Sequence, residues 1–442
     1  MIKKIKIKGA KFIMKNFIKE LRTFNILWST QSLSQLGSAM TGFALTLWVY
    51  EKTGSALQTA LLSICSYAPY VLMSIFAGAL SDRWDKKKVM LVCDTFAACC
   101  TVLVLVLLKT GLLMPIHIYF LNAINGLMNT VQQPASDVAM TMIIPKEYYQ
   151  KTSGMRSFSN SLITILNPVL ATALFAFAGM EIVIYMDLAT FAIAFTALLF
   201  WVKFPFGLNG GTQEKEPLLM IVKEGLRYLR NHDLVLVLIL FLAGVNLVAS
   251  AFDAALPAFV LPRENGGEKV LGIVTSCAGI AMLIGSLIVT LLPQPKNRIR
   301  IIHITMLISL GTENYLLAFS RTPVVWCLAQ IIGWLLVPLM SANLDVILRK
   351  TIPLEMQGRV YSCRNTLQFF TIPIGTFMGG FMVDKLCEPV MASASADGLL
   401  TVLFGSGKGS GAAMVMFILG VAGTAVCLGF GRILQKYEYT DK

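Results

Sequence analysis

The stretch from Gly78 to Lys88, GALSDRWDKKK, decides the fold class of this chain, because it places an Asp-Arg pair and three lysines between two long apolar segments. The turn is too short to contain a domain of its own. Both flanking segments, residues 55–80 and 88–109, are long and apolar enough to cross a membrane as helices. We therefore expect a charged turn that joins two membrane-spanning helices in a movable bundle, which makes transport the first function to consider.

The composition is that of a protein that crosses a membrane many times. Of 442 residues, 56% are hydrophobic and 14% are charged, whereas an average soluble domain has about 25% charged residues. Twelve segments reach the ~20 mostly apolar residues that a spanning helix needs: 24–49, 55–80, 88–109, 114–140, 152–178, 181–203, 233–261, 269–292, 299–320, 323–348, 355–383 and 411–433. The sequence thus predicts an all-α polytopic membrane protein with twelve transmembrane helices.

The formal net charge of +13 is explained by topology rather than by a nucleic-acid partner. With twelve spans, 28 of the 37 lysines and arginines fall in segments on one side and seven in the loops on the other. Such an excess marks the cytoplasmic side. Both termini are therefore expected in the cytoplasm, where the basic residues would contact anionic membrane lipid.

The two halves of the chain repeat each other at an offset of 208 residues. Asp137, Ile144-Pro145, Glu147 and Arg156 correspond to Asp345, Ile352-Pro353, Glu355 and Arg364. Parallel repeats of six spans are the plan of one large class of secondary transporters. The expected domains are a basic tail (1–23), a six-helix bundle (24–204), a linker with an amphipathic helix from Pro217 (205–231), a second six-helix bundle (232–434) and a short tail (435–442).

GALSDRWDKKK resembles the loop signature of the major facilitator superfamily, written G-x-x-x-D-R-x-G-R-[RK], through Gly78, Asp82, Arg83, Lys86 and Lys87. Asp85 stands where the family usually has glycine, and Asp tolerates a left-handed turn better than most residues. More narrowly, the chain resembles macrolide-efflux-type drug exporters through LWVYEKTGSA (47–56), SDRWDKKKVMLVCD (81–94), QQPA (132–135), IIPKEYYQ (143–150), MQGRVYS (356–362) and PIGTFMGGFMVDK (373–385). It departs from the drug-antiporter signature of helix five, where Asn167-Pro168 replaces Gly-Pro.

The resemblance implies two pseudo-symmetric six-helix bundles with a gate at the cytoplasmic end. Asp82 would cap the helix that begins near Leu354–Gly358, because unpaired N–H groups at a helix start favour an anion. Lys86 or Arg83 would pair with Asp137, and Glu147–Arg156 and Glu355–Arg364 would complete the gate. The predicted gating residues are Gly78, Asp82, Arg83, Lys86, Lys87, Asp137, Glu147, Arg156, Asp345, Glu355 and Arg364. The alternative is that they are ordinary loop charges.

Four acidic residues within the predicted spans are candidates for proton coupling: Asp253, Glu313, Asp94 and Asp187. An ionised carboxylate that faces lipid is costly, so each should face protein or water. Asp253 is our first choice, because it lies before Pro257 in a helix that lines the cavity in this family. Glu313 follows, in a helix that the family usually places toward lipid. Asp94 is better explained as a partner of an arginine or lysine, and Asp187 as a hydrogen-bonded anchor.

Polar residues in the cavity-lining helices are candidates for substrate contact: Gln31, Gln35, Asn125, Asn129, Asn160, Asn246, Asn343 and Gln368. For any single one, a hydrogen bond between helices is the simpler explanation, at about 0.6–2 kcal/mol. Nearly all of the nine cysteines fall inside predicted spans, so no structural disulfide is expected. No Cys/His spacing suggests a metal site, and no stretch resembles a cofactor-binding loop, so neither a metal nor a cofactor is expected.

These observations predict a monomeric secondary active exporter in the bacterial plasma membrane. It would move an amphipathic, drug- or macrolide-like small molecule outward by alternating access, in exchange for protons. Alternatives are export of an endogenous metabolite such as a siderophore, transport of a lysolipid, or a membrane sensor that retains the transporter fold. An enzyme has the least support.

Overall fold

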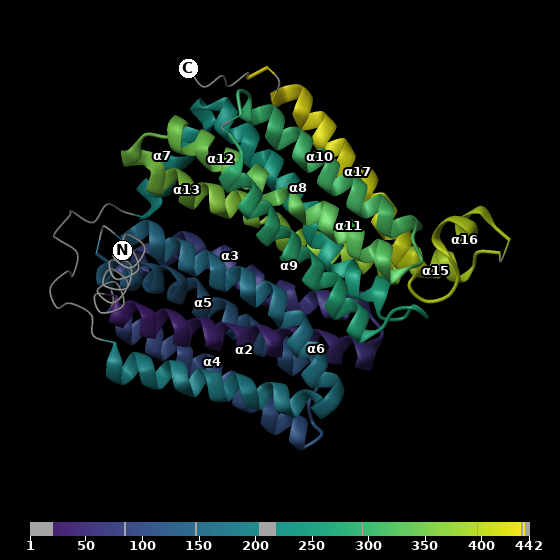
Figure 1. Ribbon diagram of the computed structural model, residues 1–442, viewed down its shortest axis with the longest axis horizontal. Coiled ribbons are helices and arrows are strands. Elements are labelled where there is room, and N and C mark those ends of the chain that lie inside the picture. Colours follow the sequence, from purple (N-terminus) through teal and green to yellow (C-terminus); the bar gives the residue numbers. More distant parts are fainter. Residues whose placement is uncertain are drawn as a thin grey trace, which may run out of the picture.

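The computed structural model describes residues 21–83, 85–145, 148–202, 218–293, 295–395, 397–434 and 436–437. The described chain folds into helices that run roughly side by side in two groups, seen below and above each other in Figure 1. The lower group holds the first half of the chain and the upper group the second half. Their interface runs through the middle of the molecule.

The described part of the first half contains five α-helices and a short π-helical turn: α2 (Arg22–Thr53), α3 (Ala56–Arg83), α4 (Lys86–Lys109), α5 (Pro115–Ile143), α6 (Tyr149–Thr196) and η2 (Ala197–Trp201). Within this half α2 packs against α6, and α5 packs against α3 and α4. α6 contains two spans, because Gly179 adopts a left-handed backbone (φ 75°, ψ 177°) that breaks the helix. A side chain there would be strained, so the chain reverses between the two predicted spans at a single glycine.

The second half begins with the linker helix and then contains six spans, two of them built from consecutive helical pieces: α7 (Leu218–Asn231), α8 (Asp233–Val260), α9 (Glu268–Leu291), α10 (Arg298–Phe319), α11 (Pro323–Leu335), α12 (Val337–Thr351), α13 (Leu354–Phe369), α14 (Thr371–Phe381), η3 (Met382–Cys387), α15 (Glu388–Ala392), α16 (Leu399–Phe404) and α17 (Ser410–Leu434). α7 lies at one end of the bundle and α16 at the other (Figure 1). We call these the α7 end and the α16 end.

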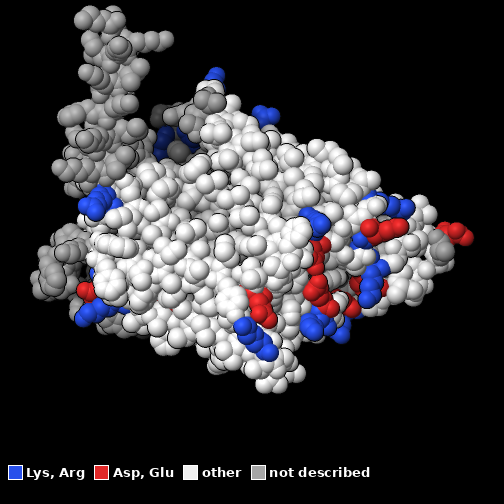
Figure 2. Space-filling model, turned by 60° about the horizontal axis from the view of Figure 1, so that its bottom comes forward, with Lys and Arg blue, Asp and Glu red and all other residues white. Residues whose placement is uncertain are grey.

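The predicted twelve-helix membrane fold is confirmed. Nine helical segments of the described chain are long and apolar enough to cross a membrane, and the longest of them, Phe158–Trp201, contains the break at Gly179 and hence two spans. α2 and α5, at 32 and 29 residues, are also long enough and complete the set. Figure 2 shows charged side chains gathered toward the two ends of the helices, with a wide uncharged expanse between them.

The turn between α3 and α4 is explained by helix capping rather than by a left-handed residue. Asp85 has φ −61° and ψ 118°, and its Oδ1 accepts a hydrogen bond of 2.9 Å from the backbone N–H of Lys88. This is the geometry of an N-cap, for which Asp is among the preferred residues. The expectation that Asp85 adopts a left-handed conformation in place of the family's glycine is therefore wrong. Asp85 instead caps the N-terminus of α4.

Candidate functional site

A cavity of ≈ 270 Å³ lies between the two halves of the protein. Its walls come from α2 and α3 on one side and from α8, α11 and α14 on the other. The residues that line it are Thr46, Thr59, Ala60, Ser63, Tyr67, Asn246, Ala249, Ser250, Asp253, Ala254, Pro257, Trp334, Ile372 and Thr376. Hydroxyl groups, small apolar side chains and two aromatic rings thus share one surface, which suits a ligand that is partly polar and partly apolar.

Asp253 is the one charged residue among the described residues that line this cavity. It lies on α8, one turn before Pro257, and its accessible surface opens into the cavity. The rings of Tyr67 on α3 and Trp334 on α11 belong to the same wall. A carboxylate beside aromatic faces is an arrangement that attracts organic cations.

The other three acidic candidates lie away from the cavity wall. Asp94 accepts a short hydrogen bond from the side-chain amide of Gln132. The partner that the structure describes for it is therefore an amide, and not the arginine or lysine that the sequence suggested. Asp187 is 5% exposed and accepts a hydrogen bond of 2.9 Å from the hydroxyl of Ser38 on α2.

Glu313 is also 5% exposed, so it faces protein and not lipid. The expectation that its helix, α10, faces lipid fails at this position, because α10 is packed between α11, α12 and α17. A Cβ placed on Gly333 of α11 would lie 2.1 Å from a Glu313 carboxyl oxygen. The carboxyl group therefore occupies space that only a glycine on the neighbouring helix leaves free.

Among the polar residues predicted to contact substrate, Asn246 lines the cavity. Its Nδ2 also donates to the carbonyl oxygen of Gln368 at 3.2 Å, and the Gln368 Oε1 accepts from the Arg364 Nε at 3.1 Å. Asn343 is 3% exposed and accepts from the buried Arg298 Nη1 at 3.1 Å, which is a contact between helices. The remaining candidates lie outside the described lining of this cavity: Gln31, Gln35, Asn125, Asn129 and Asn160.

At the α16 end the halves are joined by Asp384 of η3. Its carboxylate accepts hydrogen bonds from the backbone N–H groups of Ala56 (3.0 Å) and Leu57 (2.9 Å) and a short one from the hydroxyl of Ser55. These groups begin α3, in the other half of the chain. A carboxylate at a helix start is stabilised by the free N–H groups and by the helix dipole. Asp384 therefore caps α3 across the interface.

Glycines let the helices of the two halves approach closely near this contact. A Cβ on Gly380 would lie 2.7 Å from the Cα of Leu57 on α3. On the other side of the interface, a Cβ on Gly272 of α9 would lie 2.7 Å from the Thr172 Oγ1 of α6, and one on Gly279 would lie 2.9 Å from a carbon of Ile165. The pairs α3–α14 and α6–α9 are therefore closely packed at these glycines.

At the α7 end, only some of the predicted gating residues have described side chains. Lys87 donates from Nζ to the carbonyl oxygens of Leu199 (3.0 Å) and Val202 (2.8 Å), where the first half ends. Arg364 lies 4.0 Å from Asp345, within the second half. Arg156 and Lys86 each have interacting partners. The side chains of Asp82, Arg83, Asp137 and Glu355, the packing around Gly78 and all of Glu147 lie outside what the structure describes.

The loops at the α16 end of the second half are held together by Arg263, which lies between α8 and α9. Its guanidinium donates to the carbonyl oxygens of Ser320 (3.1 Å), Phe404 (3.3 Å) and Gly409 (3.3 Å) and lies 4.2 Å from the ring centroid of Phe259. Burial and the nearby Arg321 lower the pKa of Arg263 to about 10, so it remains charged at neutral pH.

Sequence reasoning did not assign Asp384 a function, although the residue lies in a stretch that resembles the exporters. Its hydrogen-bond partner Ala56 is 328 residues away along the chain, and no local pattern connects the two. It also missed the hydroxyl residues of the cavity wall, Thr59, Ser63 and Thr376. A polar residue on an otherwise apolar helix face was the signal available for them.

The comparisons with known proteins agree with this architecture. The family model of the Major Facilitator Superfamily matches residues 27–376. The chain is 26% identical over 370 residues to macrolide efflux protein A of Streptococcus pyogenes, covering 82% of this chain and 90% of that protein. It is 22% identical over 294 residues to the staphyloferrin A transporter of Staphylococcus aureus, covering 64% of this chain and 70% of that protein.

Among solved structures, a variant of the nucleoside transporter NupG has the same fold. It superimposes with a TM-score of 0.68 at 14% sequence identity, covering 93% of this chain and 98% of that one. At this identity the likeness concerns the arrangement of helices and not the cargo.

Proposed function

The chain belongs to the Major Facilitator Superfamily, and on that premise we propose that it is a secondary active exporter of amphipathic, macrolide-like small molecules. The cargo would enter the cavity between the halves, and the halves would then rock so that the cavity opens to the other side. Protons moving inward would drive the cargo outward. The single observation that carries the proposal is the mixed polar and aromatic cavity with Asp253 in its wall.

The cavity supports an amphipathic cargo because its wall offers both kinds of contact. Tyr67 and Trp334 provide flat apolar surface, and Thr59, Ser63 and Ser250 provide hydroxyl groups. A small number of polar groups in an apolar wall fixes the orientation of a ligand without demanding one exact shape. The similarity to macrolide efflux protein A points to the same class of cargo.

Export of a siderophore is the second candidate, favoured by the similarity to the staphyloferrin A transporter. The cavity argues against it for a carboxylate-rich metal chelator. Such a cargo would bring negative charge next to Asp253, and none of the described lining residues is a lysine, arginine or histidine that could compensate.

The proposal includes an orientation in the bacterial plasma membrane. The excess of lysine and arginine in the segments at the α7 end would place this end, and both chain termini, in the cytoplasm. The α16 end, where Asp384 caps α3, would then face outward. The residues assigned to a gate at the α7 end, with Asp82 foremost, remain predictions of the sequence.

The experiment is transport of radiolabelled erythromycin into proteoliposomes whose lumen is more acidic than the bath. Protons leaving the lumen should drive erythromycin in, and a protonophore should abolish the accumulation. Protein-free liposomes correct for the passive trapping of this weak base. Binding of erythromycin without any gradient-driven flux above that control would remove the proton-driven exporter from consideration.

A further inference from the structure

Glu313 lies one side chain away from the cavity. The residue after Gly333 is Trp334, whose ring lines the cavity and whose indole lies close to the Glu313 carboxyl group. The hydroxyl of Ser309, one turn before Glu313, donates to the carbonyl oxygen of Gly333 at 2.6 Å and fixes α10 against α11 at this level. Trp334 thus separates two carboxyl groups: Asp253 in the cavity and Glu313 behind the wall.

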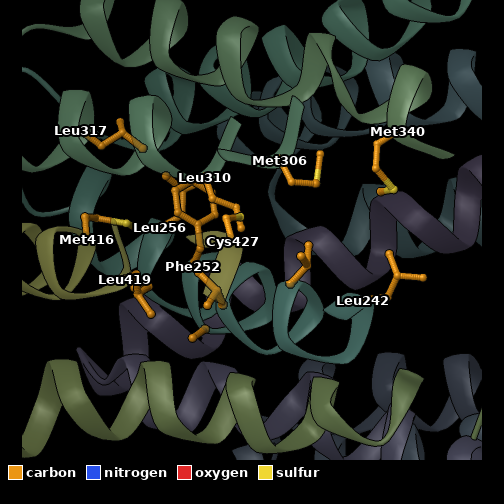
Figure 3. Close-up of a cluster of buried hydrophobic side chains, with 14 of the residues drawn as sticks. Leu242, Phe252, Leu256, Met306, Leu310, Leu317, Met340, Met416, Leu419 and Cys427 are labelled. Atoms are coloured by element: carbon orange, nitrogen blue, oxygen red, sulfur yellow. The ribbon is translucent and has the colours of Figure 1, made fainter. Parts of the chain in front are cut away.

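The Glu313 carboxyl group is incompletely satisfied within the part of the chain that the structure describes. Its Oε1 is buried and has no hydrogen-bond partner there. Figure 3 shows Leu310 and Leu317 of the same helix packed with Phe252 and Leu256 of α8 in the core of this half. A buried polar oxygen without a partner carries a desolvation cost that a functional role can explain.

The helices around the two carboxyl groups offer no basic side chain to neutralise them. α11 and α14 contain no charged residue, and the charged residues of α8 are Asp233 and Asp253. The one charged residue of α17, Arg432, lies in its last turn, near the α7 end.

On the remaining helices the basic side chains lie at the ends, except on α13, where Arg364 donates to the Gln368 Oε1 and lies 4.0 Å from Asp345. On α10 they are Arg298, Arg300 and His303; since His303 is ten residues before Glu313, it lies about 15 Å away along the axis. The basic residues of α2 lie in its first and last turns, and those of α12 lie in its last turn. The single basic residue of α3 is its last residue, Arg83, and the single basic residue of α9 is Lys269 in its first turn. The titratable groups close enough to interact electrostatically with Asp253 are Glu313 and the phenol of Tyr67. Arg364 already has Asp345 and Gln368 as partners, so a counter-charge for Asp253 and Glu313 must come from a proton or from the cargo.

We propose that the two carboxyl groups have separate roles in the exchange: Asp253 is the counter-ion of a cationic cargo, and Glu313 holds the proton that is exchanged for this cargo. This rests on the proposed function and adds to it the charge of the cargo, the identity of the proton carrier and the separating role of Trp334. The substrate class is an amphipathic organic monocation, such as an amine or a quaternary ammonium compound.

The charges balance over one transport cycle because one carboxyl group binds the cargo cation and the other binds one proton. With the cavity open outward, the cargo cation leaves Asp253, and Glu313 takes a proton from water to form its O–H bond. With the cavity open inward, that bond breaks, the proton passes to water, and a new cation binds at Asp253. One positive charge moves in for each one that moves out, so the exchange of a monocation is electroneutral.

The test uses ethidium, a permanent monocation that cannot itself carry a proton, with the whole protein in proteoliposomes. Glu313→Gln should bind ethidium within a fewfold of the unaltered protein and exchange it across the membrane, yet lose accumulation driven by a pH gradient. Asp253→Asn should lose ethidium affinity by about tenfold or more, because the ion pair in the cavity is gone. With acid inside, the accumulation rate of the unaltered protein should not change when potassium and valinomycin impose a membrane potential.

The outcomes separate this inference from the proposed function. If Glu313→Gln still accumulates ethidium on a pH gradient, Glu313 is not the proton carrier, although the exporter stands. If a membrane potential drives the flux, more than one proton moves for each cation, and the proposed roles of one carboxyl group for the cation and one for the proton are wrong. If Asp253→Asn binds ethidium and protonated erythromycin as tightly as the unaltered protein, the assigned charge of the cargo is wrong; if the unaltered protein moves neither compound, the proposed function fails.

A second variant covers the case in which Glu313→Gln does not fold. Trp334→Phe keeps an aromatic ring in the cavity wall but removes the indole N–H that faces Glu313. Measured at saturating ethidium, so that a change in affinity at the cavity wall does not enter, the pH dependence of exchange should shift. An unchanged pH profile would contradict the role given to Glu313.

Discussion

The carboxylate of Asp384 in the second half of the chain accepts a hydrogen bond of 2.9 Å from the backbone N–H of Leu57 in the first half. Ala56 and Ser55 donate to the same carboxylate. The contact exists only while η3 and the start of α3 are adjacent, which requires the halves to be together at the α16 end. Asp384 therefore stabilises one conformation of the transporter relative to the other.

Replacing Asp384 with alanine should favour the conformation in which the α16 end is open. Hydrogen bonds to a charged group contribute about 1.5–3 kcal/mol, so the equilibrium should shift by roughly tenfold or more. Spin labels at Lys109 and Lys269, on opposite halves near this end, would report the change as a longer distance in a background without native cysteines. The control is Asp397→Asn, which alters an exposed carboxylate in the loop before α16. An unchanged distance distribution in Asp384→Ala would exclude the capping role.

Gly380→Val should also prevent closure at the α16 end, for a steric reason. A Cβ at Gly380 would lie 2.7 Å from the backbone of α3, closer than atoms can pack, so the two helices would have to separate. Transport should fall while cargo binding from the α7 end persists. Gly429→Val is the matched control, because a Cβ there meets nothing within 4 Å. Equal transport by both variants would show that close packing of α14 on α3 is not needed.

Asp187 should act as an anchor between α6 and α2 and not as a proton carrier. Asp187→Asn keeps an oxygen that can accept the hydrogen bond from Ser38, so the thermal stability and the pH-driven flux should both be close to normal. Asp187→Leu removes the acceptor and should lower stability by about 1 kcal/mol, seen as a lower melting temperature in detergent. Loss of pH-driven flux in a fully stable Asp187→Asn would instead assign this residue to coupling.

Lys87 should contribute to the stability of the first half more than to gating. Its ammonium group bonds to the carbonyl oxygens of Leu199 and Val202, which end η2 and have no further turn of helix to accept them. Lys87→Met should lower the melting temperature and leave the affinity for cargo intact. Lys88→Met, which alters an exposed neighbour, should change neither. A Lys87→Met protein of normal stability whose halves favour a different conformation would support the gate instead.

Hydropathy predicted the spans well because lipid imposes a length and an apolar character that one stretch of sequence displays by itself. Even the break at Gly179 falls between two predicted spans. The rotation of each helix about its axis is not determined this way. Asn343 and Asn246 are both single asparagines on apolar helices, yet the first faces Arg298 within one half and the second faces the cavity. The difference arises from helix packing, which depends on side chains far apart in the sequence.

Glu313 is a second residue whose surroundings could not be predicted from the sequence. Its charge made it a candidate, but the environment that gives it a possible role comes from Gly333 and Trp334 on a neighbouring helix. Neither residue has a distinctive pattern around it. The candidate could be named from the sequence, whereas its separation from the cavity by one aromatic ring required the structure.

Because the chain reverses at Gly179, the first half protrudes less than the second half at the α16 end. The first half turns back there within one residue, whereas the second half carries α15, α16 and the loops around them beyond its spans (Figure 1). An antibody, a protease or an inserted epitope tag at this surface would therefore meet the second half. The loop at Gly407, where a Cβ meets nothing within 4 Å, offers a natural insertion point that the tight reversal of the first half does not.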